Sequence, residues 1–314
     1  MLAFAQTPQA PAGIINDVGN FSHIVDNLER AAAFYRDVIG LEVAQPPAAF
    51  APNPPIMDLG NTPGAQSRIA TFRVPGSQLG VELIEYKDIA RTPVKPRFQD
   101  PGSVSLVLYV WNIKPILSRL SSAGVSWEHS NAQSIPPFSS IFVQDADGFF
   151  IEINWEPPID YSQGNIHRAA IEFRVEETEQ TLKFWRDVLK FPVGTSTNYE
   201  KERPMDITGF RGAEFKRTFA RVPGTDWSIV LREFRNIDRK KLNTKTQDPG
   251  TPILQLRAPD VDAMTAAWKA AGGEVISKGG VPAVIGGTTK IVLLRDPNGV
   301  MVEVLPAPRP SAGK

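Results

Sequence analysis

The chain has 314 residues, of which 42% are hydrophobic and 22% charged, which gives enough apolar material for a folded core and room for about two domains. Its 34 basic and 34 acidic residues cancel, which argues against a nucleic-acid or membrane-surface protein, because either partner needs a basic field or stripe. The sequence has no cysteine and only three histidines, His23, His129 and His167, so thiolate sites are excluded and any metal site must depend mainly on oxygen ligands.

The first 13 residues are expected to lie outside the folded part. Ala3-Phe4-Ala5 before Gln6 fits the small-x-small pattern of a signal-peptidase site, although no charged region or full apolar segment precedes it. Two interpretations stay open: the end of a signal peptide, which would indicate export, and a Pro/Ala-rich tail of a cytoplasmic protein. No apolar run approaches the roughly 20 residues needed to span a bilayer, so we expect a soluble protein.

The next stretch predicts one strand, one helix and three strands. FSHIV is a short strand, Asp26 or Asn27 is suited to cap the helix that follows, and Gly40 is expected to end it. The helix has one apolar face, formed by Leu28, Ala31, Tyr35 and Val38. Strand candidates follow at LEVA, RIATFRV and LGVELIEY. Residues 45–67 are rich in Pro and Gly, and we expect a loop of the kind that often closes over a ligand.

The following stretch repeats this order. VSLVLYVWN after Gly102 suits a strand, and IKPILSRLSSAG is a short helical pattern closed by Gly124. SIFVQDADGFFIEINW predicts a hairpin with its turn between Asp145 and Gly148. Alternation along the second strand of this hairpin places three side chains on one face, those of Phe150, Glu152 and Asn154.

The second half of the chain repeats the first. FYRDVI, which starts at Phe34, corresponds to FWRDVL, which starts at Phe184. Three more pairs follow in the same order: TFRVPG and TFARVPG, QDPG and QDPG, and DADGFFIEI and DPNGVMVEV. The last pair aligns Glu152 with Glu303. Four ordered matches indicate two copies of one domain. We place the copies at residues 14–160 and 165–307, with 161–164 as the linker and 308–314 as a tail.

Two of these motifs carry a resemblance to a known family. NLERAAAFYRDVIGLEV resembles the first helix and second strand of the vicinal oxygen chelate superfamily, which includes glyoxalase I, extradiol dioxygenases and bleomycin-resistance proteins. DADGFFIEI and DPNGVMVEV resemble its terminal turn and strand. The resemblance implies an α+β fold of four βαβββ modules. These modules would form two glyoxalase-like domains, each a cup-shaped mixed sheet with the helices outside.

The resemblance also implies where a metal would bind, because in the metal-dependent members the ligands come from the first and last strand of each module. In the first domain those positions are Asn20, Glu82, Ser105 and Glu152, with Glu85 as an alternative to Glu82. This set of oxygen ligands suits Mg, Mn or Ca. Glu152 would be the catalytic residue, as a metal ligand or as a general base whose pKa is raised by burial.

The second domain is expected to be degenerate. Its corresponding positions are Ala170, Val230, Ile253 and Glu303, and because three of these have no ligand atom we expect no metal there. His23 lies three residues from Asn20, so in a regular strand its side chain points to the opposite face. It is expected to pack or hydrogen-bond between sheet and helix; a bulge that would turn it toward the ligand face stays open.

Two functions fit these observations. The first is an enzyme of the glyoxalase or dioxygenase type, in which a divalent metal in the first domain acts on a small molecule. The alternative is a metal-free small-molecule binding protein of the bleomycin-resistance type. The missing histidines favour the alternative. Glu82 and Glu152 favour the enzyme, because two facing carboxylates repel each other unless a cation or proton lies between them. A monomer and a homodimer are both compatible with the repeat.

Overall fold

The computed structural model describes residue 15 and residues 17–129, 139–156, 164–201, 212–223, 225 and 227–307. The expected signal peptide or tail at the N-terminus and the tail at 308–314 lie outside them. In the part of the chain that is described, no helix is long and apolar enough to cross a membrane.

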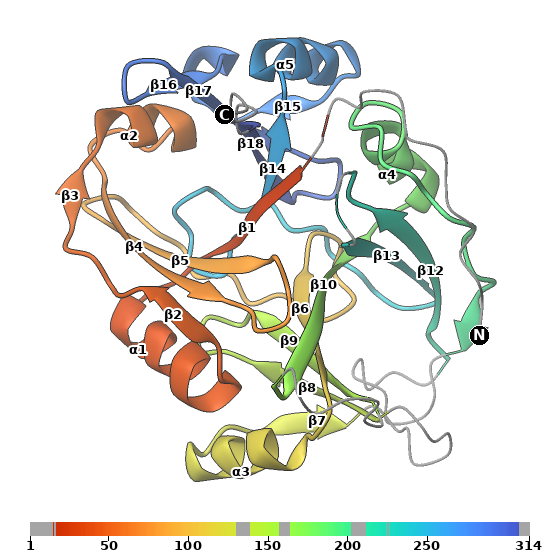
Figure 1. Ribbon diagram of the computed structural model, residues 1–314. Coiled ribbons are helices and arrows are strands. Elements are labelled where there is room, and N and C mark those ends of the chain that lie inside the picture. Colours follow the sequence, from red (N-terminus) through yellow and green to blue (C-terminus); the bar gives the residue numbers. More distant parts are fainter. Residues whose placement is uncertain are drawn as a thin grey trace, which may run out of the picture.

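Four successive segments each begin with a strand and a helix and continue with strands (Figure 1). Segment 1 contains β1 (Asp17–Ile24), α1 (Leu28–Ala33), the π-helix η1 (Phe34–Ile39), β2 (Glu42–Gln45), β3 (Ala51–Pro52), α2 (Pro54–Gly60), β4 (Gln66–Arg73) and β5 (Gly80–Lys87). Segment 2 contains β6 (Val104–Val110), α3 (Lys114–Ser122), β7 (Trp127–His129), β8 (Ser139–Gln144) and β9 (Phe150–Trp155).

The second half follows the same plan. Segment 3 contains β10 (Ile166–Val175), α4 (Thr178–Trp185), β11 (Glu200–Lys201), β12 (Glu214–Arg221) and β13 (Ser228–Arg235). Segment 4 contains β14 (Pro252–Ala258), α5 (Val261–Ala270), β15 (Glu274–Val275), the 3-10 helix η3 (Lys278–Gly280), β16 (Ala283–Ile285), β17 (Thr289–Arg295) and β18 (Met301–Pro306).

The strands form two mixed sheets, and each sheet combines both halves of the chain. Sheet A has the order β15-β17-β18-β14-β1-β5-β4-β2 and comes from segments 1 and 4. Sheet B has the order β11-β12-β13-β10-β6-β9-β8-β7 and comes from segments 3 and 2. We call the face of sheet A that carries Asn20 and Glu82 cup A, and the face of sheet B that carries Ser105 and Glu152 cup B.

This pairing corrects the prediction that each half of the chain closes its own cup. β1 pairs with β14 in an antiparallel manner, with Phe21 opposite Leu254, and β6 pairs with β10, with Leu106 opposite Ile171. The physical reason is that the two copies present similar first strands. An internal repeat therefore does not determine which copies pair, and long-range packing decides it.

The features predicted for the first helix are confirmed. The Asn27 side chain caps α1 by accepting a hydrogen bond from the backbone N–H of Arg30 at 2.8 Å. The helical segment continues through η1 and ends at Gly40, whose φ of 95° lies in the left-handed region that favours glycine. The four predicted apolar residues, Leu28, Ala31, Tyr35 and Val38, are buried.

Residues 45–67 contain more regular structure than the expected loop. They include β3 and the seven-residue helix α2, which begins with proline at its first positions and ends at Asn61 in the left-handed conformation. α2 lies against segment 4, where Ser277 Oγ donates a hydrogen bond to the carbonyl of Leu59 at 3.0 Å. Tertiary contacts thus hold a helix that is too short to be stable alone.

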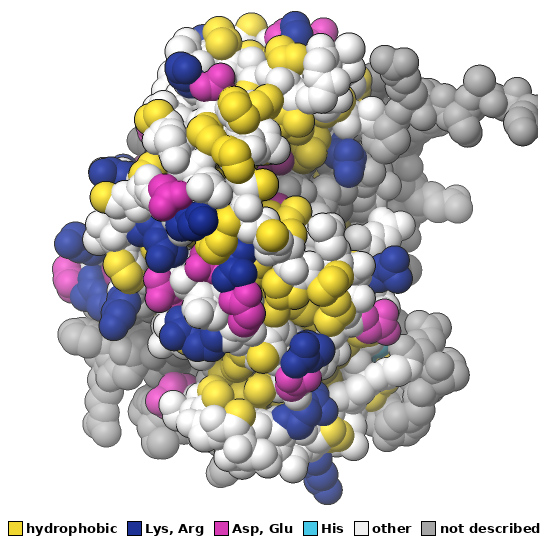
Figure 2. Space-filling model, turned by 90° about the vertical axis from the view of Figure 1, so that its left-hand side faces the viewer, with side chains coloured by type: hydrophobic (Ala, Val, Ile, Leu, Met, Phe, Trp, Pro, Cys, Tyr) yellow, Lys and Arg dark blue, Asp and Glu magenta, His cyan; other side chains and the backbone are white. Residues whose placement is uncertain are grey.

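One continuous apolar core lies between the outer faces of both sheets and helices α1, α3, α4 and α5, which confirms an α+β fold with helices outside. Each cup holds its own smaller apolar cluster, around Ile84 and Leu293 in cup A and around Phe98 in cup B. On the surface of the segment 1 side, acidic and basic side chains are mixed, as the balanced composition predicts (Figure 2).

Candidate active site

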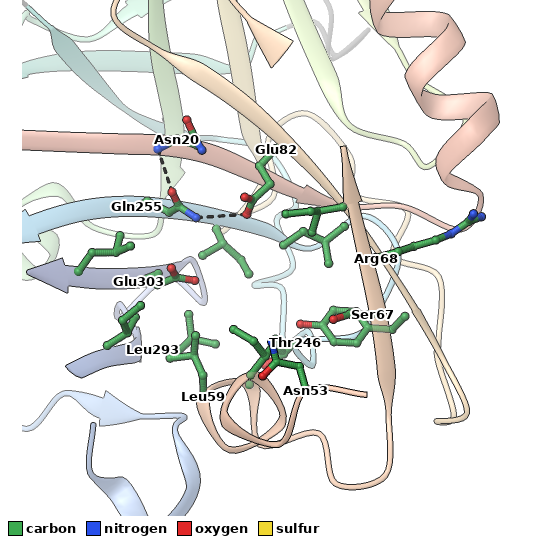
Figure 3. A pocket seen from close by; sticks show the side chains of 18 of the residues that line it. Asn20, Asn53, Leu59, Ser67, Arg68, Glu82, Thr246, Gln255, Leu293 and Glu303 are labelled. Atoms are coloured by element: carbon green, nitrogen blue, oxygen red, sulfur yellow. Dashed lines mark hydrogen bonds between the residues drawn. The ribbon is translucent and has the colours of Figure 1, made fainter. Parts of the chain in front are cut away.

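Cup A contains a cavity of about 480 Å³ between sheet A and α2 (Figure 3). Four polar residues on four neighbouring strands line its floor: Asn20 on β1, Glu82 on β5, Gln255 on β14 and Glu303 on β18. Its walls are mostly apolar, with Ile56 and Leu59 of α2 opposite Ile84, Ile253, Leu293 and Leu305 of the sheet. The cavity therefore combines apolar walls with a polar floor. Further polar side chains also line it, among them Arg68 and Arg257.

Strand alternation points these side chains inward. On β5, Glu82 and Ile84 line the cavity, whereas Val81 and Leu83 belong to the core on the opposite face. Gly80, the first residue of β5, leaves room for the Asn20 side chain. A Cβ at Gly80 would come within 2.2 Å of Asn20 Oδ1.

A chain of hydrogen bonds fixes Glu82. Glu82 Oε1 accepts hydrogen bonds from Ser22 Oγ at 3.0 Å and from Gln255 Nε2 at 3.2 Å. The Gln255 side chain is held in turn, because its Oε1 accepts from the backbone N–H of Asn20 at 3.0 Å. Glu82 is thus a positioned carboxylate with two neutral donors.

Glu303 lies in the same cavity without such support. Its carboxyl group accepts no hydrogen bond from any residue in the described chain, and burial together with the charge of Glu82 raises its pKa to about 8. Burial also raises the pKa of Glu82, while Ser22 and Gln255 act in the opposite direction. Both side chains are half-buried and line the cavity. The carboxyl group of Glu303 is therefore largely protonated near neutral pH.

Cup B holds the other two predicted ligands, Ser105 and Glu152, in a different setting. Ser105 Oγ accepts a hydrogen bond from Arg174 Nη1 at 2.7 Å. Glu172 pairs with Arg232 at 2.8 Å and with Arg174 at 3.4 Å. Burial and Glu172 raise the pKa of Glu152, whereas the charges of Arg232 and Arg174 lower it. Arginine supplies the cation that the carboxylates require.

Aromatic rings pack beside these ion pairs. The guanidinium of Arg174 lies 3.6 Å from the ring centroid of Phe98, which comes from the connection between segments 1 and 2. Phe98 also packs against Phe142, Phe150 and Phe234. This part of cup B is a packed interior of ion pairs and aromatic rings.

The structure divides the four predicted ligands into two pairs, one in each cup. Asn20 and Glu82 share cup A, while Ser105 and Glu152 lie in cup B. Sequence reasoning missed the partners of the first pair, Gln255 and Glu303, which lie side by side on β14 and β18. The repeat aligned Glu303 with Glu152. Nothing in the sequence indicated that segment 1 pairs with segment 4, and this pairing is what places Glu303 in the same cavity as Glu82.

Glu85, the alternative to Glu82, has a structural position on the opposite face. Its Oε2 accepts from the backbone N–H of Leu28 at 2.9 Å and pairs with Arg68 at 2.7 Å. The second copy repeats this arrangement, since Glu233 accepts from the backbone N–H of Thr178 at 2.7 Å. Glu85 therefore holds the start of α1 and does not line the cavity.

His23 packs on the outer face of sheet A, as expected for a residue three positions from Asn20. It is fully buried, and its Nε2 lies 2.9 Å from Asp145 Oδ2. Together with Asp147, these residues form a group of three side chains that could hold a metal ion. This group belongs to the far side of β1 and not to cup A.

The residues of cup A fit a hard divalent cation. Of the ligand positions implied by the family resemblance, Asn20, Glu82 and Glu303 carry oxygen atoms and Ile253 carries none. No histidine lines the cavity in the part of the chain that the structure describes. Such a set favours Mg, Mn or Ca over metals that prefer imidazole. The unpartnered carboxyl group of Glu303 is the observation that supports the fit.

Comparisons with known proteins agree with this architecture. The chain is 29% identical over 160 residues to a probable lactoylglutathione lyase of Vibrio parahaemolyticus, a match that covers 48% of this chain and 97% of that protein. Its fold is similar to that of glyoxalase I from Zea mays, with 16% identity, a TM-score of 0.59 and 92% of each chain covered. A profile of the Glyoxalase/Bleomycin resistance protein/Dioxygenase superfamily matches residues 18–153 and 166–304. The chain belongs to that superfamily.

Proposed function

We propose that this protein is an enzyme of the glyoxalase or dioxygenase type that acts on a small molecule bound in cup A. The observation that carries the proposal is the carboxyl pair of Glu82 and Glu303, which share one cavity but have different surroundings. A pair of acids whose environments separate their protonation states is typical of acid–base catalysis.

The two carboxyl groups would have different roles. Glu82 is held by Ser22 and Gln255 and is the group suited to accept a proton from a bound substrate. Glu303, which is largely protonated near neutral pH, is suited to donate a hydrogen bond or a proton to a substrate oxygen. A pKa close to the working pH favours such transfers.

A divalent cation, when bound, would be held by Asn20, Glu82 and Glu303. Glu303 would then be ionised and would act as a ligand in place of a proton donor. The cation would polarise neighbouring oxygen atoms of the substrate and stabilise negative charge that develops on them. With or without it, Ile84, Ile253 and Leu293 would bind the apolar part of the substrate, and α2 would exclude water from the cavity. The substrate class is therefore a small molecule that has adjacent oxygen atoms and an apolar part.

The test is turnover and binding with lactoylglutathione and with uncharged 2-oxoaldehyde–thiol adducts, each with and without Mg²⁺, Mn²⁺ or Ca²⁺. We expect Glu82→Gln and Glu303→Gln to lower kcat by about a hundredfold or more, the usual range for an acid–base group. Glu152→Gln in cup B is the matched control and should keep the activity. Equal losses in all three variants would refute the assignment to cup A.

The apolar walls and Ile253 favour a second function, a metal-free small-molecule binding protein. In that case apolar ligands would bind and remain unchanged, and Glu82→Gln and Glu303→Gln would alter affinity alone. Binding without turnover across the whole panel would favour this second function over the first.

A further inference from the structure

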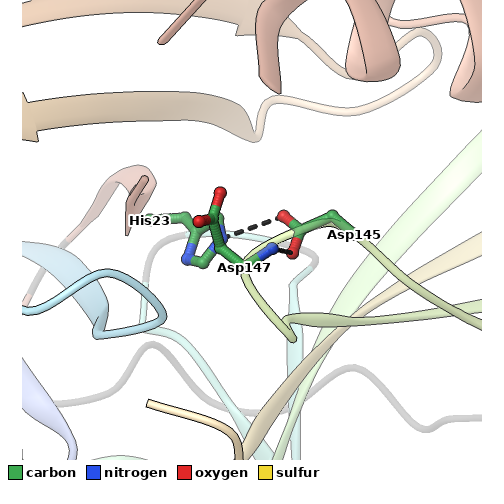
Figure 4. Close-up of side chains that lie close together, drawn as sticks. All are labelled: His23, Asp145 and Asp147. Carbon is green, nitrogen blue, oxygen red and sulfur yellow. Dashed lines mark hydrogen bonds and ion pairs between the residues drawn. The ribbon is translucent and has the colours of Figure 1, made fainter. Parts of the chain in front are cut away.

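A second constellation lies outside the cups, where segment 1 meets segment 2 (Figure 4). His23 comes from β1 and points away from cup A, and Asp145 and Asp147 come from the turn between β8 and β9. The ligand atoms of the three side chains all lie within 4.8 Å of one another. Residues far apart in the sequence thus converge on one buried point.

The side chain of Asp145 holds the turn between β8 and β9. Its Oδ1 accepts hydrogen bonds from the backbone N–H groups of Asp147 at 3.0 Å and Phe149 at 2.9 Å. Its Oδ2 accepts from the hydroxyl of Tyr35 at 3.1 Å. These bonds close the hairpin and attach it to η1.

His23 and Asp147 leave buried polar atoms without partners. Asp147 Oδ1 accepts from the backbone N–H of Asp26 at 3.1 Å and lies 3.7 Å from Arg30 Nη2, but Asp147 Oδ2 has no hydrogen-bond partner. His23 Nε2 also makes no hydrogen bond, although the ring is fully buried against Phe149, and among the described residues only the carboxylate of Asp145 lies within ion-pair distance, at 2.9 Å. Such atoms are rare in native proteins and require an explanation, for example an ion.

The equivalent junction between segments 3 and 4 shows what the fold itself needs. There Asp296 closes the turn in the same way, accepting from the backbone N–H groups of Asn298 and Val300, both at 2.9 Å. Trp185 replaces Tyr35 as the donor to the second oxygen of the aspartate, at 3.4 Å. Phe173, packed on Trp185, stands at the position of His23.

Asn298 stands at the position of Asp147, and it is fully satisfied. Its amide nitrogen donates to Asp296 Oδ2 and to Thr181 Oγ1, both at 3.0 Å, and its oxygen accepts from the backbone N–H of Glu176 at 2.8 Å. The second junction therefore holds together without a histidine or a second acid. His23 and Asp147 are additions that the fold does not require.

We propose that His23, Asp145 and Asp147 bind a divalent transition-metal ion that joins segments 1 and 2. The ligands would be His23 Nε2 and one carboxylate oxygen from each aspartate, and the proton between His23 and Asp145 would leave when the ion enters. One imidazole and two carboxylates suit Mn, Fe, Co or Zn better than Mg or Ca. Because the site is buried and lies behind cup A, the ion has a structural role and is separate from the proposed active site.

The experiment uses Co²⁺, whose visible absorption reports its ligands, and the full chain carrying Glu82→Gln and Glu303→Gln, so that cup A does not contribute. We expect one Co²⁺ per chain, a higher melting temperature with the metal, and displacement by Zn²⁺. Adding His23→Phe and Asp147→Asn, which reproduces the second junction, should weaken binding by about a hundredfold or more, since even outer-shell changes cost ten- to a hundredfold.

Two results would overturn the proposal: no Co²⁺ binding to the chain that lacks the cup A carboxylates, or binding that survives His23→Phe with Asp147→Asn. Near-UV circular dichroism without metal checks that the variant is folded. If it is not folded, Asp147→Asn alone gives the same test, because it keeps His23 beside Asp145 and removes one ligand. Since cup A is disabled throughout, the outcome is independent of the proposed catalytic function.

Discussion

Cup A and cup B come from strands of the same repeat, yet they treat their carboxylates in opposite ways. In cup A, Glu82 and Glu303 face a cavity that Arg68 and Arg257 also line, but neither glutamate forms an ion pair with a lysine or arginine of the described chain. In cup B, Arg174 and Arg232 lie beside Glu152 and Glu172, and aromatic rings pack next to them. Charge balance, more than the position of a glutamate in the repeat, distinguishes a candidate site from a packed interior.

The largest expected effect comes from breaking the charge balance of cup B. Arg174→Met would leave Glu152 and Glu172 buried with one cation fewer, and we expect it to destabilise the protein by about 3–5 kcal/mol. Urea unfolding measures this loss. Glu82→Gln in cup A is the matched comparison, since it removes no partner of a buried charge. A loss below 1 kcal/mol, on the scale of an exposed ion pair, would contradict the role of Arg174.

Glu303→Gln should stabilise the protein, and the size of this stabilisation should depend on pH. The pKa of Glu303 rises from an ordinary 4.5 to about 8 in the folded protein. The native chain therefore has its full stability below about pH 4.5 and loses part of it as the pH rises through 8. At pH 8.5 we expect the variant to be more stable by on the order of 2 kcal/mol, with the difference vanishing near pH 4.5.

Melting temperatures between pH 4 and 9 test this prediction. Glu42→Gln, on an exposed part of β2, is the control, and its difference in melting temperature from the native chain should not increase between about pH 4.5 and 8.5. If the melting temperatures of the native chain and of Glu303→Gln change with pH in the same way, the raised pKa of Glu303 is contradicted.

A smaller effect concerns α2, which covers cup A. Ser277 is buried, donates to the carbonyl of Leu59 at 3.0 Å and accepts from the backbone N–H of Leu293 at 2.8 Å. Ser277→Ala should cost about 1–2 kcal/mol and speed hydrogen exchange in α2. Lys278→Ala removes only the exposed ion pair with Asp58 and should cost less. Unchanged exchange in α2 would argue against its attachment through Ser277.

The smallest effect concerns the first helix of each half, α1 and α4. Asn27→Ala should destabilise the protein by about 1 kcal/mol, because its side chain caps α1. At α4 the equivalent residue, Glu177, makes no such hydrogen bond, so Glu177→Ala should be close to neutral. Chemical unfolding of both variants gives the difference, and equal losses would contradict the assignment of the cap.

Much of the fold and half of the site could be predicted from the sequence. The cap at Asn27, the stop at Gly40 and the inward position of Glu82 follow from local rules of helices and strands. Glu303 as the partner of Glu82 could not be predicted, because similar strands can pair in more than one combination and long-range packing decides among them. Helix α2 was missed because it is short and depends on contacts with Ser277 and its neighbours.

The central claim is that segments 1 and 4 form one site in which Glu82 and Glu303 interact. Carbon-13 NMR of the glutamate carboxyl groups across a pH titration tests it most directly. We predict that Glu303 titrates near pH 8, that Glu82→Gln lowers this pKa, and that Glu152→Gln leaves it unchanged. A Glu303 that titrates in the ordinary range, or that responds to Glu152→Gln but not to Glu82→Gln, would contradict the account.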